Sequence, residues 1–149
     1  MASPLNVALI GFGLAGRVFH APLIEATPGL RLHTVVSSDA ARVAALHPHV
    51  RVLAAPDDAF ADADIDLEVI ATPNHTHAPL ASAALAQGRH VVVDKPFALD
   101  IAEAGAVIEA AERAQRVLSV FHNRRWDADF LSLRGLLANG TLGRVSEVH

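Results

Sequence analysis

The chain has 149 residues, of which 52% are hydrophobic, a formal net charge of −4 and no cysteine. This length suits one domain with a substantial core, and the lack of cysteine excludes a disulfide framework and a thiolate metal site. No apolar run approaches the roughly 18–20 residues of a membrane-spanning helix, and the start MASPLNVALIG does not match a secretory signal. The acidic balance disfavours nucleic acid as a partner. We therefore expect a cytoplasmic protein that binds neither membranes nor nucleic acids.

Short apolar runs rich in β-branched residues alternate with helical patterns along most of the chain. Continuous apolar runs of this length are typical of strands that are covered on both faces. Their alternation with helices predicts βαβ units in an α/β fold, with a doubly wound parallel sheet and helices on both faces. We expect Glu68 near the solvent end of its strand, because an unpaired carboxylate is costly to bury. The expected strands span residues 7–11, 32–37, 66–72, 90–94 and 117–121.

Capping signals mark the ends of the helices. Thr76 and Gly88 are expected to begin and end one helix, and a last helix follows Trp126 and stops at Asn139. Pro22 should kink or shorten the first helix. The helix that begins at Asp100 repeats apolar residues at helical spacing, and its buried stripe is expected to consist of Ile101, Ala104, Ile108 and Ala111.

Three glycines follow the first expected strand. The stretch from Gly11 to Gly16 fits G-x-G-x-x-G between a strand and a helix, which is the context that a Rossmann-type dinucleotide site requires. The first glycine permits a tight turn, the second admits a pyrophosphate, and the third lets helix and strand pack closely. The helix start then offers amide groups to the phosphates. The predicted cofactor-binding residues here are Gly11, Phe12, Gly13, Leu14, Ala15 and Gly16.

The end of the second strand bears on the choice between NAD and NADP. An NAD site commonly places an acidic residue about 20 positions after the glycines. Here Ser37 and Ser38 stand at that point, with Asp39 slightly later and Arg42 one turn on. Hydroxyl groups and a guanidinium suit a 2′-phosphate, so NADP is favoured over NAD. The alternative, that Asp39 caps the next helix and Arg42 is a solvated surface residue, stays open.

Asp94, Lys95 and Pro96 follow the expected strand at 90–94, at the sheet edge where ligands bind in such folds. Lys95 there could hold a substrate hydroxyl and exchange its proton, so Lys95 is the candidate catalytic residue. A lysine after a strand is otherwise usually a surface residue. The nine histidines show no metal-ligand spacing. We expect solvated histidines at 47, 49, 75 and 77 and no metal.

Four segments taken together resemble the N-terminal half of the Gfo/Idh/MocA oxidoreductases. They are LIGFGLAGRVFHAPLI, VIATPNHTHAPLASAAL, HVVVDKPFALD and LSVFHNRRWDADF, and they span nearly the whole chain. The resemblance implies that Lys95 matches the lysine of the family's Glu-Lys-Pro motif, which contacts substrate. Asp94 replaces the glutamate of that motif, which puts its positioning role in doubt. The further cofactor-site residues that the resemblance implies are Ala71, Thr72, Pro73, Asn74, His77, Asp94, Lys95, Asn123 and Arg125.

The resemblance also implies a domain organisation and a substrate class. Residues 1–142 would form the cofactor domain, and residues 143–149 would start a truncated second α/β domain that covers the nicotinamide. An unpaired strand from Val145 would favour pairing with another copy of the chain. Two functions stay open. One is an NAD(P)-dependent oxidoreductase acting on a sugar, polyol or related metabolite, present here as its cofactor-binding half; the other is a non-catalytic nucleotide-binding or regulatory module.

Overall fold

The computed structural model describes residues 3–147, which form one six-stranded sheet with the strand order β3-β2-β1-β4-β5-β6. Every neighbouring pair of strands is parallel, so the predicted doubly wound sheet is confirmed. The chain reverses its direction of winding between β1 and β4, where such sheets bind ligands. The strands are β1 Leu5–Ile10, β2 Leu30–Val36, β3 Arg51–Leu53, β4 Leu67–Ile70, β5 His90–Asp94 and β6 Leu118–Phe121.

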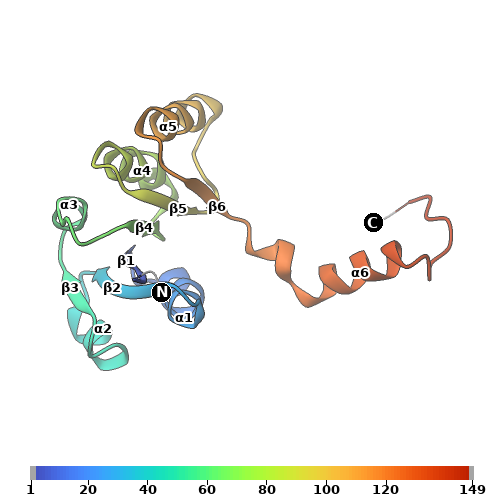
Figure 1. Ribbon diagram of the computed structural model, residues 1–149, viewed down its shortest axis with the longest axis horizontal. Helices are drawn as coiled ribbons and strands as arrows, with labels where there is room; N and C mark the ends of the chain where they lie inside the picture. The colour runs from blue at the N-terminus through green and yellow to red at the C-terminus, as the bar shows by residue number, and fades with distance from the viewer. Residues whose placement is uncertain (1–2, 148–149) are drawn as a thin grey trace.

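Helices cover both faces of this sheet (Figure 1). Helices α1 (Ala21–Ala26) and α2 (Ala40–Leu46) pack on one face, and α3 (Pro56–Phe60), α4 (His77–Ala86) and α5 (Ile101–Ala114) pack on the other. Strand β1 shows why a parallel strand reads as a continuous apolar run, since its successive side chains serve opposite faces. The side chains of Val7 and Leu9 join one core cluster, whereas those of Ala8 and Ile10 join the other.

Most of the predicted helix signals act as expected. The carboxylate of Asp100 accepts the amide of Glu103 at 2.8 Å, and Gly88 ends its helix with a φ of +75°. Pro22 does disturb the first helix, which opens as a π-helical turn, η1 (Gly16–His20), before α1 begins. Thr76 stands at the start of α4, but its hydroxyl donates to the carbonyl of Pro73 instead of capping that helix.

Two expectations about burial are wrong. In α5, Ile101 is 90% exposed and Ile108 is also exposed, whereas Val107 and Ala111 are buried. The helix covers the end of the sheet and packs beside α4, so only a narrow face of it meets the core. Glu68 is fully buried in β4, facing the α4 side of the sheet, and in the described structure neither carboxylate oxygen has a hydrogen-bond partner. Burial raises the pKa of Glu68 to about 8, against the opposing effect of the Arg89 charge.

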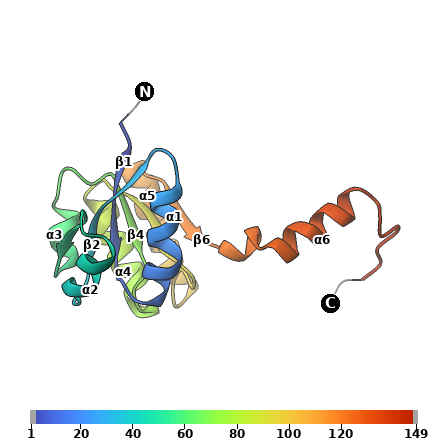
Figure 2. The ribbon, with the colours of Figure 1, turned by 90° about the horizontal axis from the view of Figure 1, so that it is seen from below.

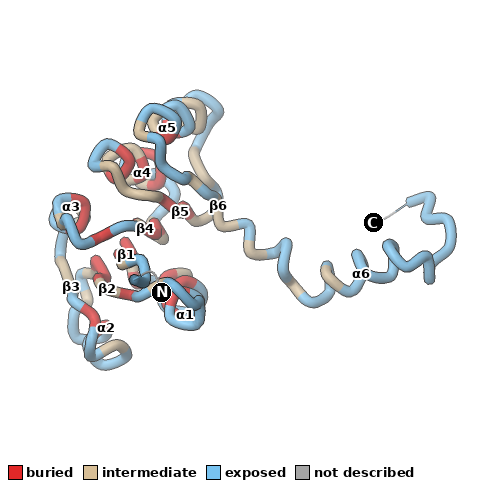
Figure 3. Tube along the Cα trace, viewed as in Figure 1, coloured by how far each residue is buried: buried red, intermediate tan, exposed pale blue. Residues whose placement is uncertain are grey.

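After β6 the chain leaves the sheet. A short turn, η3 (Asn123–Trp126), leads into α6 (Ala128–Ala138), which extends away from the rest of the molecule (Figure 2). Within the described chain α6 buries none of its residues, whereas buried residues line the sheet and its helices (Figure 3). The strand expected from Val145 is not formed by residues 145–147, and residues 148–149 lie outside the described range. None of the described helices is long and apolar enough to cross a membrane.

Candidate functional site

The glycine loop joins the end of β1 to η1 and is shaped by close backbone contacts. Gly11 has a φ of +99°, and a Cβ atom there would lie 2.6 Å from the carbonyl oxygen of Ala71. A Cβ atom at Gly16 would collide with the carbonyl oxygen of Gly11. Both positions therefore need glycine to let the loop fold back on the sheet, as the motif predicts.

Gly13 differs, because no described atom lies within 4 Å of a Cβ built on it. Protein packing thus does not require glycine at this position, but a glycine leaves the loop open to a ligand that approaches the backbone. Phe12 is buried beneath the loop, where its ring meets His47 edge-on with 5.7 Å between the ring centroids. The loop therefore offers its backbone outward, and the residues present fit a dinucleotide diphosphate.

A cavity of about 400 Å³ opens beside this loop and gathers residues from four strand ends. Seven of its lining residues, from three segments, are among the site residues predicted from the sequence, namely Gly11, Phe12, Gly13, Ser37, Ser38, Arg42 and Thr72. Ala54 and Pro56, which follow the three-residue strand β3, also line the cavity and were not predicted. The second-strand residues and the glycine loop thus line one space, as a nucleotide site requires.

Asp39 and Arg42 pair with each other at the rim of this cavity. The carboxylate of Asp39 accepts the amide of Arg42 at 3.0 Å and lies 3.1 Å from its guanidinium. Asp39 is therefore the N-cap of α2, as the alternative interpretation held. Arg42 nevertheless remains about half exposed and lines the cavity.

A second hollow, of about 610 Å³, lies at the carboxyl ends of β5 and β6. Lys95 and Arg125 are exposed here, and Asn123 is half-buried; the resemblance implied all three as site residues. The hollow is also lined by Pro96, His122 and Arg124. The carboxyl edge of the sheet therefore carries a cationic amine beside polar groups, which is an arrangement that could hold a hydroxylated or anionic substrate.

Asp94 is turned away from this hollow and toward the helix that follows the glycine loop. One carboxylate oxygen accepts the Lys95 amide at 2.7 Å, and the other lies 3.5 Å from Nε2 of His20. The His20 ring is buried, and its centroid is 4.4 Å from that of Phe121. Burial lowers the pKa of His20, although the nearby charge of Asp94 opposes this. No sequence signal pointed to His20.

His77 is buried, so the expectation that it is solvated is wrong. Its Nδ1 lies 2.7 Å from the Pro96 carbonyl oxygen, and its Nε2 lies 2.8 Å from that of Thr72. It therefore joins the segments that follow β4 and β5. His47 is also largely enclosed and lies 2.8 Å from a carboxylate oxygen of Glu25.

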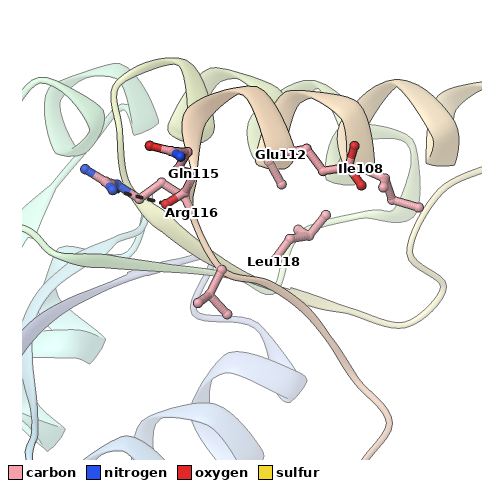
Figure 4. Close-up of a pocket in the computed structure, with 7 residues that line it drawn as sticks. Ile108, Glu112, Gln115, Arg116 and Leu118 are labelled. Atoms are coloured by element: carbon pink, nitrogen blue, oxygen red, sulfur yellow. Dashed lines mark hydrogen bonds between the residues drawn. The ribbon is translucent and has the colours of Figure 1, made fainter.

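The remaining predicted residues lie around these features. Leu14 is 69% exposed on the outside of the loop, Ala15 is half-buried beside it, and Ala71 lies beneath Gly11. Pro73 and Asn74 are exposed after β4. A further hollow of about 460 Å³ lies between α5 and the start of β6 (Figure 4). It is at the amino end of that strand and so is separate from the candidate site. No group of three metal-ligating side chains occurs among residues 3–147.

The fold and the open glycine loop define a dinucleotide-binding domain of the Rossmann class. Comparison with known protein families identifies the family to which this domain belongs. The chain belongs to the Gfo/Idh/MocA group, described as an oxidoreductase family with an NAD-binding Rossmann fold, whose sequence model matches residues 5–122.

Individual relatives agree with this assignment. The Escherichia coli protein named uncharacterized oxidoreductase YdgJ is 54% identical over 146 residues, which is 98% of this chain and 42% of that protein. The NADP⁺-dependent scyllo-inositol 2-dehydrogenase IolW of Bacillus subtilis is 33% identical over 95% of this chain and 40% of its own length. A solved structure from Klebsiella pneumoniae superposes with a TM-score of 0.94 at 54% identity and covers 97% of this chain and 42% of its own. The chain thus spans about two fifths of the length of these relatives.

Proposed function

We propose that this chain is the cofactor-binding part of an NAD(P)-dependent oxidoreductase that interconverts a hydroxyl and a carbonyl group on a sugar or polyol. The observation that carries the proposal is the open backbone at Gly13, at the same edge of the sheet as Lys95. The name of one relative, the scyllo-inositol 2-dehydrogenase IolW, supports the substrate class. The cytoplasmic location, the second domain from residue 143 and pairing between copies stay predictions.

Two groups of residues would carry out cofactor binding and proton transfer. The loop from Gly11 to Gly16 would hold the diphosphate, and Ser37, Ser38 and Arg42 would hold the adenosine ribose. The nicotinamide, when bound, supplies the hydride donor or acceptor. Lys95 would donate a hydrogen bond to the substrate oxygen and carry its proton, while the cationic side chain of Arg125 lies beside it.

We further propose that the cofactor is NADP. Arg42 lines the adenosine end of the cavity, and its exposed guanidinium can exchange its contact with Asp39 for one with a 2′-phosphate. Ser37 and Ser38 line the same cavity and add hydroxyl donors. The name of the Bacillus subtilis relative, an NADP⁺-dependent enzyme, agrees with this preference.

Titration of NADPH and NADH, followed by nicotinamide fluorescence, tests both proposals. We expect saturable binding of both, with NADPH bound more tightly. Arg42→Ala should weaken NADPH by roughly tenfold, the effect of losing a charged hydrogen bond, and leave NADH nearly unchanged. Arg113→Ala is the matched control, since Arg113 lies on α5 and pairs with Glu109. Failure of both nucleotides to bind would reject the function, and equal losses for both in Arg42→Ala would reject the choice of NADP.

A further inference from the structure

Lys95 stands between two residues that each face a buried histidine. The carboxylate of Asp94, on one side, accepts the Lys95 amide and faces Nε2 of His20 at 3.5 Å. The carbonyl oxygen of Pro96, on the other side, lies 2.7 Å from Nδ1 of His77. Lys95 itself is exposed, so its own side chain is not packed in place. Its location is therefore set by the backbone on either side of it.

The two histidines come from the two segments that would hold the cofactor. His20 ends η1, the helical turn that follows the glycine loop. His77 begins α4, directly after the turn that follows β4, and its Nε2 lies 2.8 Å from the carbonyl oxygen of Thr72. Thr72 also lines the cavity beside the glycine loop. Each histidine thus joins a cofactor segment to the backbone that carries Lys95.

The chemistry of His77 suits this bridging. A carbonyl oxygen can only accept hydrogen bonds, so a ring nitrogen of His77 that carries a proton donates to the carbonyl oxygen that it faces. Because His77 is buried, the two carbonyl oxygens face the imidazole ring and not solvent. The bridge between Thr72 and Pro96 is consequently a specific feature and not a chance surface contact.

We propose that His77 and His20 are positioning residues that hold the Lys95 backbone against the two cofactor-binding segments, so that Lys95 is placed for chemistry by the same elements that bind the dinucleotide. His77 fixes the side after Lys95, and His20 fixes the side before it through Asp94. This inference rests on the proposed function for its catalytic meaning, but the bridging itself can be measured without cofactor.

The sequence supplies a direct probe, because Lys95 is the only lysine in the chain. Reductive methylation with ¹³C-formaldehyde labels the Lys95 amine and the chain's α-amine. The ¹³C–¹H NMR signal of Lys95 then reports its surroundings. We expect the folded wild type to show a signal distinct from that of the urea-unfolded chain, and NADP⁺ to shift that signal saturably.

Two conservative variants separate the contacts of His77. Asn places its amide nitrogen near the site of Nδ1, whereas Gln places it near the site of Nε2. His77→Asn should therefore keep the Pro96 contact and a near-native Lys95 signal, whereas His77→Gln keeps only the Thr72 contact and should move the signal toward its unfolded position. His20→Ala should move it in the same direction, with rescue by His20→Gln. His75→Ala is the matched control, since His75 is an exposed neighbour.

The outcomes distinguish this inference from the proposed function. If the wild type binds neither nucleotide, the function fails, but the comparison of His77→Asn with His77→Gln still tests the bridging. If all folded His77 and His20 variants keep the wild-type Lys95 signal, with and without NADP⁺, the positioning role is rejected. Circular dichroism establishes which variants are folded, and the Asn and Gln pair decides the question even if an alanine variant fails to fold.

Discussion

The sheet with its covering helices and the α6 segment both contain many apolar side chains, but only the first region buries them. In the sheet, Leu9 of β1 and Ile70 of β4 are completely buried between two layers of helices. In α6, Phe130 is 46% and Leu136 is 39% exposed, although the helix is rich in leucine. Apolar composition alone therefore does not decide burial, because a buried side chain also needs a second surface to pack against.

The two regions also differ in what holds them. The sheet region is held by main-chain hydrogen bonds between five pairs of adjacent strands and by two hydrophobic core clusters. The start of α6 has no side-chain cap, and an isolated helix of 11 residues is marginal in water. We therefore expect stability to reside almost entirely in the sheet region, and the following predictions test this difference in order of decreasing effect.

The largest effect is expected from a cavity in the core. Ile70→Ala should lower the free energy of unfolding by about 4 kcal/mol, since Ile70 is fully buried in the central strand β4. The matched change in α6, Leu136→Ala, should alter it by less than about 0.5 kcal/mol. Urea unfolding followed by circular dichroism measures both. Similar losses at the two positions would contradict the contrast between the regions.

The second prediction concerns two glycines of one loop. Gly16→Ala should cost on the order of 2 kcal/mol, because its Cβ atom would collide with the Gly11 carbonyl oxygen. Gly13→Ala meets no described atom and should change stability by less than about 0.5 kcal/mol. Gly13→Ala should nevertheless lower the affinity for NADPH at least about tenfold, because the added methyl group blocks the approach of the diphosphate to the backbone. If Gly13→Ala binds NADPH normally, the loop does not bind the diphosphate as proposed.

The third prediction is a pH dependence located in the sheet. The pKa of Glu68 is about 8 in the folded chain, above the ordinary 4.5, so the folded state keeps a proton that the unfolded state loses. The contribution of Glu68 to stability is therefore greatest below about pH 4.5 and falls as the pH rises to about 8. Glu68→Gln mimics the protonated form, so its free energy of unfolding at pH 9 should exceed that of the wild type by about 5 kcal/mol.

Urea unfolding of the wild type and of Glu68→Gln at several pH values between 5 and 9 measures how the free energy of unfolding changes with pH. Glu112→Gln provides the control, because Glu112 is exposed on α5. Parallel pH profiles for wild type and Glu68→Gln would show that Glu68 is ionised and accommodated in the folded core.

The smallest effect is expected from removing the extended segment. A chain that ends after Trp126 should unfold with a free energy within about 0.5 kcal/mol of the full chain, because α6 buries none of its residues in the described structure. It should also bind NADPH equally well, since no cavity at the glycine loop includes α6. A loss of several kcal/mol on truncation would show that α6 packs against the sheet region in solution.

The sequence predicts features that depend on local chemistry. Continuous β-branched runs revealed five of the six strands, and the glycine spacing revealed the loop, because each reflects a constraint that acts within a few residues. Strand β3 has only three residues and too short a pattern to be recognised. Its neighbours Ala54 and Pro56 were missed in the site for that reason.

Features that depend on tertiary packing were not predicted. The spacing predicted a buried stripe of Ile101, Ala104, Ile108 and Ala111. Ala111 is buried as predicted, but Ile101 and Ile108 are exposed, and Val107 is the other buried residue of α5. His20 reaches Asp94 across 74 positions of sequence, and nothing near His20 indicates that partner. Glu68 is buried, and neither of its carboxylate oxygens has a hydrogen-bond partner within the described chain. It is therefore an exception to the rule that unpaired carboxylates lie near solvent, on which its predicted position was based.

A crystal structure with NADP⁺ bound tests the central claim most directly. We expect the diphosphate to lie against the backbone from Gly13 to Ala15, the 2′-phosphate beside Arg42 and the nicotinamide at the Lys95 edge of the sheet. A diphosphate bound elsewhere, or no bound nucleotide at saturating concentration, would contradict it.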